Sequence, residues 1–105
     1  MINQSCSITN GRATARILWL EPWADQVEIR PGATVKLIAT SDKPGEIHIE
    51  DTESTLTVYG WPSSRLTVVC DDDRIWESHA PAPSVPTNMD MRSFVKFMFH
   101  PQTPD

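Results

Sequence analysis

Between Val27 and Val69 the sequence alternates apolar with polar residues in five short stretches, which clusters of turn-forming residues separate. Side chains two apart on a strand lie on the same face, so each stretch predicts a β-strand with one buried side. Short strands at this spacing are typical of antiparallel sandwiches and barrels. The sequence therefore predicts an all-β fold, either a small antiparallel β-sandwich or a jelly-roll-like barrel. The five stretches are QVEIR, TVKLIAT, EIHIE, TLTVYG and RLTVV.

The same alternation predicts which side chains form the core. A first strand from Thr14 to Leu20 precedes the five stretches, and Trp19 shares its parity with Ile17, so both are expected to be buried. A last hairpin is expected at the aspartates 71–73, leading into Ile75. The core pairs predicted within the alternating stretches are Val27 with Ile29, Ile47 with Ile49, and Leu56 with Val58.

The chain has 105 residues, a size that suits one domain with its own core. Its composition divides it into four parts. Residues 1–12 are polar and predict a flexible leader, and residues 13–79 contain the predicted β domain. Residues 80–87 are rich in proline and predict an extended linker. Residues 88–105 form a C-terminal segment beyond that linker.

The C-terminal segment carries apolar residues at helical spacing, which predicts a short helix with one apolar side. Val95, Phe97 and Phe99 also alternate, so an added edge strand is the other interpretation. An apolar side of this kind can bind a groove on a protein partner or on a second copy, or it can fold back onto its own domain. The residues at helical spacing are Met91, Phe94, Val95 and Met98.

Charge and hydropathy narrow the classes of partner. Nine lysines and arginines against fourteen acids give a net charge of -5, which disfavours nucleic acid and anionic membranes as partners. A cationic protein surface is compatible with this charge. The apolar run Ile17–Leu20 is too short for a signal peptide or a membrane span, so a cytoplasmic location is expected. Cys6 and Cys70 agree with that location as free thiols, although a disulfide stays open.

A metal site is one alternative to a binding module. His48, Glu50 and Glu53 loosely resemble the spacing of histidine and glutamate in the cupin metal motif, and such residues can bind a metal when they converge in one cavity. If Ile47 and Ile49 face the core, however, His48 and Glu50 face solvent. The sequence also lacks a second histidine two residues along, so the exposed interpretation is preferred.

A carbohydrate-binding module is a second alternative. Trp23 and Trp61 each lie beside a proline at a strand end, where an indole ring usually plugs the end of a sandwich. The same rings could instead form an exposed platform for a sugar or for a protein partner.

Catalysis has no positive support in the sequence. The serines lie in turns or in the leader, and neither a nucleophile elbow nor a phosphate-binding glycine loop occurs. The sequence therefore favours a non-enzymatic protein-interaction or structural β module without a cofactor. Its candidate binding residues are the four apolar residues of the C-terminal segment, Met91, Phe94, Val95 and Met98, together with Trp23 and Trp61.

Three motifs occur in order: LEPW at residues 20–23, PG at residues 31–32, and GWP at residues 60–62. In this respect the region from about residue 16 to residue 70 resembles a group of small bacterial proteins with the same pattern of motifs. The resemblance implies a small β domain of bacterial type and carries no activity with it. The C-terminal segment lies outside the region of resemblance.

Overall fold

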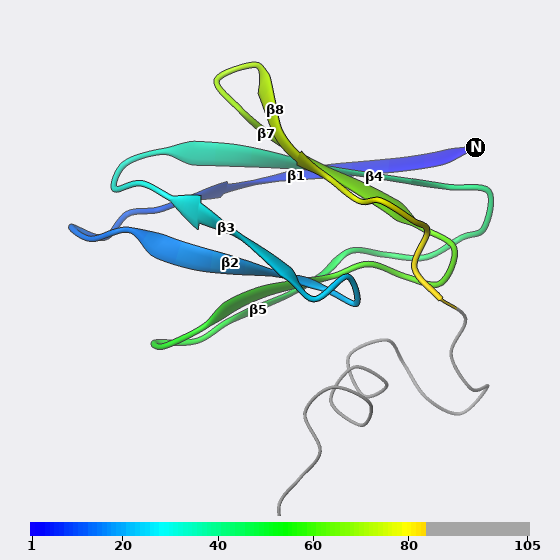
Figure 1. The fold of residues 1–105 in the computed structure, drawn as a ribbon, viewed down its shortest axis with the longest axis horizontal. Coiled ribbons are helices and arrows are strands. Elements are labelled where there is room, and N and C mark those ends of the chain that lie inside the picture. Colours follow the sequence, from blue (N-terminus) through cyan, green and yellow to red (C-terminus); the bar gives the residue numbers. More distant parts are fainter. Residues whose placement is uncertain (84–105) are drawn as a thin grey trace, which may run out of the picture.

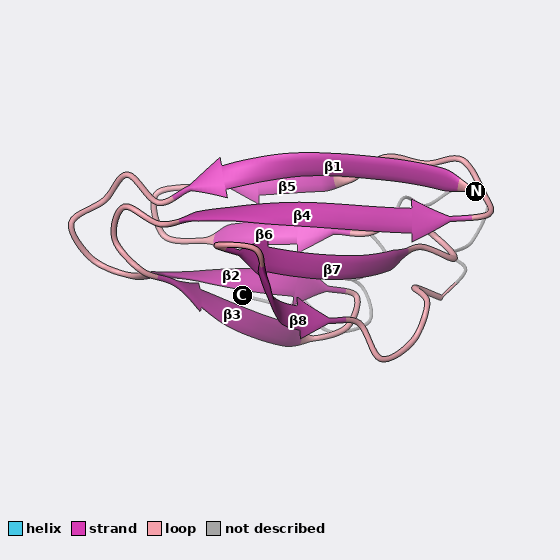
Figure 2. Cartoon of the chain, turned by 90° about the horizontal axis from the view of Figure 1, so that it is seen from above, coloured by secondary structure: helices cyan, strands magenta, loops and turns pink. Residues whose placement is uncertain are grey.

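The computed structural model describes residues 1–83, which form eight β-strands in two sheets that pack face to face (Figure 1). The strands are β1 (Ile2–Thr9), β2 (Arg16–Glu21), β3 (Asp25–Ile29), β4 (Thr34–Ser41), β5 (His48–Asp51), β6 (Leu56–Tyr59), β7 (Arg65–Cys70) and β8 (Asp73–Glu77). The strand orders are β1-β4-β7-β8 in one sheet and β3-β2-β6-β5 in the other, and Figure 2 views the sandwich from above, with the first sheet in front of the second. The predicted all-β sandwich is confirmed. Among residues 1–83 no helix has the length and apolarity that crossing a membrane requires.

Neighbouring strands pair antiparallel, with the exception of β2 and β6, which run parallel. The predicted hairpin between β7 and β8 is present. Its two-residue loop, Asp71 and Asp72, has φ angles of 53° and 65°, a conformation that matches the twist of a tight hairpin. Gly32, with φ 77°, follows Pro31 in the turn between β3 and β4, where a residue without a Cβ avoids strain.

The core lies between the two sheets and is built from the inward-facing side of each. Leu18 and Leu20 of β2 lie opposite Leu56 and Val58 of the parallel strand β6, so four aliphatic side chains form one patch. The side chains of β4 and β7 cover this patch from the other sheet. The buried core residues are Leu18, Leu20, Ile29, Val35, Leu37, Ala39, Leu56, Val58, Trp61, Leu66 and Val68.

The prediction of a flexible leader is wrong for most of residues 1–12. Residues 2–9 form β1, which pairs with all eight residues of β4. The serine, asparagine and glutamine residues of this segment have low β propensity, but a full ladder with β4 satisfies its backbone groups. Ile2 and Ile8 also pack against the core. The β domain therefore begins at Ile2 rather than at residue 13.

Two predictions of burial are also wrong. In the structure Ile17 and Trp19 point outward, and Leu18 and Leu20 point into the core. The prediction failed because a continuous apolar run does not reveal which of its two sides faces inward. Ile49 lies opposite the buried Val58, but it belongs to an edge strand at the margin of the core and is 37% exposed.

Side chains bridge the two open sides of the sandwich. On one side Gln4 of β1 donates from Nε2 to the carbonyl of Gly45 and accepts the N–H of Ile47 at 3.0 Å, which joins β1 to the segment before β5. On the other side Trp76 of β8 donates from Nε1 to Oδ2 of Asp25 on β3 at 2.7 Å. These contacts connect the edges of one sheet to the edges of the other.

Two glycines make room for the tryptophans at the ends of the strands. A side chain at Gly45 would collide with the ring of Trp61, and a Cβ at Gly60 would lie 2.7 Å from Cη2 of Trp23. Such close approach requires glycine. The GWP motif therefore has a packing explanation: Trp61 fills the space above Gly45, while Gly60 accepts Trp23.

Candidate functional site

The outward side of the sheet β3-β2-β6-β5 carries aromatic and aliphatic side chains at its centre. Ile17 and Trp19 of β2 point away from the core and are 37% and 42% exposed. The strand register places Thr57 of β6 beside Trp19 and places Tyr59 beside Glu21. We call Ile17, Trp19, Thr57 and Tyr59 the apolar face.

Part of this outward side is buried. Tyr59, Glu21 and Thr57 are only 4%, 5% and 8% exposed, although all three share the outward parity of the exposed Trp19. Tyr59 does not belong to the core cluster. Its neighbour on β5 is His48, whose ring centroid lies 5.8 Å away and which is itself exposed. The outward side of a sandwich sheet is usually solvated, so the burial of these three side chains sets this side apart.

The charge around the apolar face is negative. Glu21 on β2, Glu28 on β3 and Glu50 on β5 lie on the same outward side, because each is in register with a residue of the apolar face. The outward strand positions of this sheet, all of them within the described residues, include no lysine or arginine. An apolar centre with acidic surroundings favours a partner segment that combines apolar with basic side chains.

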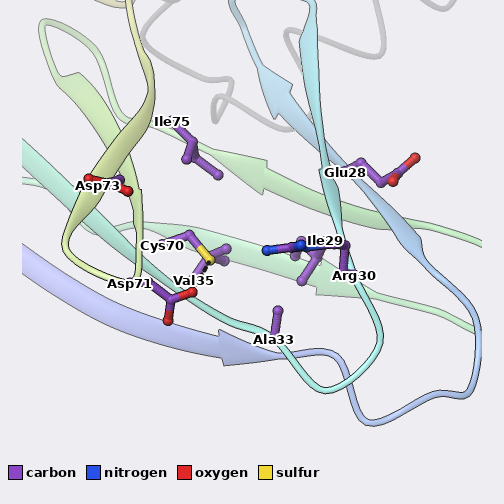
Figure 3. Close-up of a pocket in the computed structure, with 9 residues that line it drawn as sticks. All are labelled: Glu28, Ile29, Arg30, Ala33, Val35, Cys70, Asp71, Asp73 and Ile75. Carbon is purple, nitrogen blue, oxygen red and sulfur yellow. Dashed lines mark hydrogen bonds between the residues drawn. The ribbon is translucent and has the colours of Figure 1, made fainter.

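A pocket of about 210 Å³ lies away from the apolar face, between the β3–β4 turn and the β7–β8 hairpin (Figure 3). Cys70 is the only thiol among its lining residues, and no histidine lines it to act as a base, so these residues do not assemble a nucleophile–base pair. Its floor is aliphatic and its rim is charged. The lining residues are Glu28, Ile29, Arg30, Ala33, Val35, Cys70, Asp71, Asp73 and Ile75.

The structure places the two tryptophans of the predicted partner or sugar site at the end of the sandwich. Trp61 is 4% exposed and donates from Nε1 to the carbonyl of Lys43 at 2.9 Å. Trp23 is partly buried and donates from Nε1 to the carbonyl of Ala80 at 2.7 Å. Both rings therefore plug the strand ends, and the indole ring with a large exposed surface is that of Trp19.

The residues of the metal alternative do not form a cluster. His48 and Glu50 alternate on the outward side of β5, and Glu53 is an exposed residue of the turn between β5 and β6. Within residues 1–83 no three His, Cys, Asp or Glu side chains are grouped so that they could bind a metal ion. Glu50 belongs instead to the acidic surroundings of the apolar face, and His48 lies next to Tyr59 of that face.

The apolar residues predicted to bind a partner from the C-terminal segment lie outside the described residues. They are Met91, Phe94, Val95 and Met98, and the linker beyond residue 83 lies outside as well. The first residues of the predicted linker are described, and they are held against the domain. Ala82 is buried and exchanges hydrogen bonds with the turn between β6 and β7, through Ser63 and Ser64.

Neither a protein-family model, nor a curated protein, nor a solved structure matches this chain. The resemblance to bacterial proteins with the LEPW, PG and GWP motifs stays a prediction. Function is therefore inferred from the geometry of the surface described above.

Trp19 and Tyr59 are the residues that the sequence analysis did not identify as a candidate site. A signal for both exists in the sequence. The segment ILWL in β2 has large apolar side chains at both parities, and in β6 Tyr59 adds an aromatic ring to the side on which Thr57 is polar, whereas a strand with one solvated side alternates throughout. Strands that are apolar on both sides indicate a sheet with a contact on each side.

Proposed function

We propose that this chain is a non-enzymatic protein-interaction module, and that it binds an extended or helical protein segment on the apolar face. The observation that carries this proposal is the exposed surface of Trp19 and Ile17, which are 42% and 37% exposed on the same outward side as Tyr59. Tryptophan and tyrosine dominate the binding energy of protein interfaces, because each buries a large area and retains a hydrogen-bonding group.

The acidic surroundings give this binding its specificity. Glu21, Glu28 and Glu50 favour a segment with lysine or arginine next to its apolar residues, and they disfavour acidic partners such as nucleic acid. The free thiols of Cys6 and Cys70 fit a reducing, cytoplasmic setting for this contact.

Selection from a random-peptide phage library tests the proposal. Full-length protein is immobilised, and a full-length form with Phe94→Ser and Met98→Ser is used in parallel, so that the chain's own apolar residues do not compete. We expect enrichment of peptides that combine aromatic or aliphatic residues with lysine or arginine. Trp19→Ser should weaken the enriched peptides by at least about tenfold, since a central tryptophan contributes more than about 1.4 kcal/mol to an interface.

Lys36→Ser is the matched control, because Lys36 is an exposed residue on the outward side of the other sheet. It should leave the affinities within about twofold. The proposal fails if neither form enriches peptides above the background, or if Trp19→Ser and Lys36→Ser weaken binding equally.

A further inference from the structure

We propose that the apolar face is occupied in the same molecule by the chain's own C-terminal segment, residues 88–105, so that the module regulates its own binding surface. This inference rests on the proposed function, because it names the first ligand of the same surface. An external partner would then have to displace this segment.

Burial on the outward side is the first argument. Tyr59 and Thr57 have the parity of solvent-facing residues and the exposure of core residues. Their outward neighbours on β5, His48 and Glu50, are an exposed and a partly buried side chain. Burial that the sandwich's own core does not provide is consistent with a covering segment.

The path of the chain is the second argument. The N–H of Ala82 donates to the carbonyl of Ser64 at 2.8 Å, and the carbonyl of Ala82 accepts the N–H of Ser63 at 2.9 Å. These serines follow β6, and Trp23, which holds the carbonyl of Ala80, follows β2. Because β2 and β6 are parallel, the C-terminal ends of both strands lie at the same end of the sandwich. The chain is therefore anchored at the end of the sandwich where the buried part of the apolar face lies.

The remaining length is sufficient for this path. Residues 84–90 comprise seven residues and span at most about 25 Å when extended. The four residues of β6 extend only about 13 Å. The linker can therefore bring Met91 and the residues after it over any part of the apolar face.

The chemistry of the segment is complementary to the face. Its apolar residues are Met91, Phe94, Val95 and Met98, and it carries Arg92 and Lys96 between them. The chain as a whole is acidic, with a net charge of -5, whereas residues 91–98 contain two cations and no acid. The face offers the opposite pattern, aromatic rings surrounded by glutamates.

Tethering makes even a weak contact effective. A short linker gives an effective concentration of about 1 mM, so a segment that binds with a dissociation constant of about 0.1 mM when separate is about 90% docked in the same chain. The inference therefore requires only modest affinity.

Nuclear magnetic resonance of the full-length, ¹⁵N-labelled chain tests the inference, with the indole N–H of Trp19 as the main probe. Phe94→Ser with Met98→Ser should shift the Trp19 indole signal and the backbone amide signals of Thr57 and Tyr59. The amides of Ser5 and Thr67, on the outward side of the other sheet, should not move. Arg92→Glu with Lys96→Glu provides a second variant with the same readout, should the first fail to fold.

Two further measurements separate the outcomes. Tenfold dilution of the wild type should leave the Trp19 signal unchanged, and a change on dilution would assign the contact to a second copy and overturn the inference. A synthetic peptide of residues 88–105 should return the Trp19 signal of the serine variant toward its wild-type position. Absence of that return, or equal shifts on both sides of the sandwich, would also overturn it.

These results are distinct from a failure of the proposed function. Library peptides that bind in a Trp19-dependent manner, while the tail variants leave the Trp19 signal in place, would retain the interaction module and remove the internal ligand. If no library peptide binds in a Trp19-dependent manner and the tail variants leave the Trp19 signal in place, both proposals fail.

Discussion

The two outward sides of this sandwich are built on the same strand geometry and differ in chemistry. On the sheet β1-β4-β7-β8 the outward residues are mainly small and polar or charged, and none of them is buried. On the sheet β3-β2-β6-β5, Glu21, Thr57 and Tyr59 are buried on the same side as the exposed Trp19. We call the first side the polar face; its outward residues on β1, β4 and β7 are Asn3, Ser5, Ser7, Thr9, Thr34, Lys36, Ile38, Thr40, Arg65, Thr67 and Val69.

The difference shows that the polar face is solvated, whereas part of the outward side of the other sheet is not. Alternation between core and solvent is clear along β1 and β4, as expected for a sheet with one solvated side. In β6 all four residues are buried. A sheet with one side against the core needs no apolar residue on its other side, so a central strand that buries both of its sides indicates a second contact.

The largest expected effect comes from replacing one outward residue on a central strand of each sheet, β6 and β7. Tyr59→Ala should lower the free energy of unfolding by about 3 kcal/mol, because it removes a buried aromatic ring. Thr67→Ala, on the polar face, should cost less than about 0.5 kcal/mol. Chemical denaturation of the full-length variants measures both. Equal costs would mean that Tyr59 behaves as an ordinary surface residue, and the comparison would break.

Much of the fold follows from the sequence for physical reasons that the two faces make clear. The strands β3, β4, β6 and β7 were predictable, because alternation with turn residues between them fixes both the strand and its buried side. The hairpin at Asp71 and Asp72 was predictable from its turn residues. These features depend on neighbours in sequence.

Features that depend on distant pairing were not predictable. The polar segment Ile2–Thr9 becomes a strand only because β4, about thirty residues away in sequence, offers it a ladder. The parity of β2 could not be read from ILWL, so Trp19 was placed in the core. The candidate site was missed for this reason: its outward side became visible only once the parallel pairing of β2 with β6 was known.

A second prediction tests whether the difference is confined to the outward sides. Val58 of β6 and Val68 of β7 are both fully buried in the core, one from each sheet. Val58→Ala and Val68→Ala should each cost about 2 kcal/mol, since each removes two buried carbon groups and leaves a small cavity. Denaturation midpoints in the full-length chain measure the costs. A clear inequality would show that the sheets also differ on their inward sides.

A smaller effect concerns the charge of the apolar face. Glu28→Gln should weaken the binding of the peptide of residues 88–105 to the Phe94→Ser, Met98→Ser chain by about 1.4-fold to fivefold, because exposed ion pairs contribute about 0.2–1 kcal/mol. Titration calorimetry at low and high salt measures the loss, which should shrink as salt screens the pair. Glu77→Gln is the control, since Glu77 lies on the other sheet and pairs with Arg74 at 2.9 Å. An equal loss in both variants would argue against a local charge contribution.

The smallest effect lies in the bond that joins the two sheets at their edges. The indole N–H of Trp76 on β8 and the backbone N–H of Gln26 hold the pKa of Asp25 on β3 below its ordinary value of 3.8. A carboxylate whose pKa is lower in the folded state adds stability above the unfolded pKa, and that stability is lost as the pH falls through the folded pKa. Wild type should therefore exceed Asp25→Asn in stability above about pH 4, by a small margin because Asp25 is exposed, and the two should converge at lower pH. Denaturation midpoints between pH 2.5 and 7 measure this, and a margin that persists unchanged below the pKa of Asp25 would assign the link between the sheets to ring packing rather than to the charge of the carboxylate.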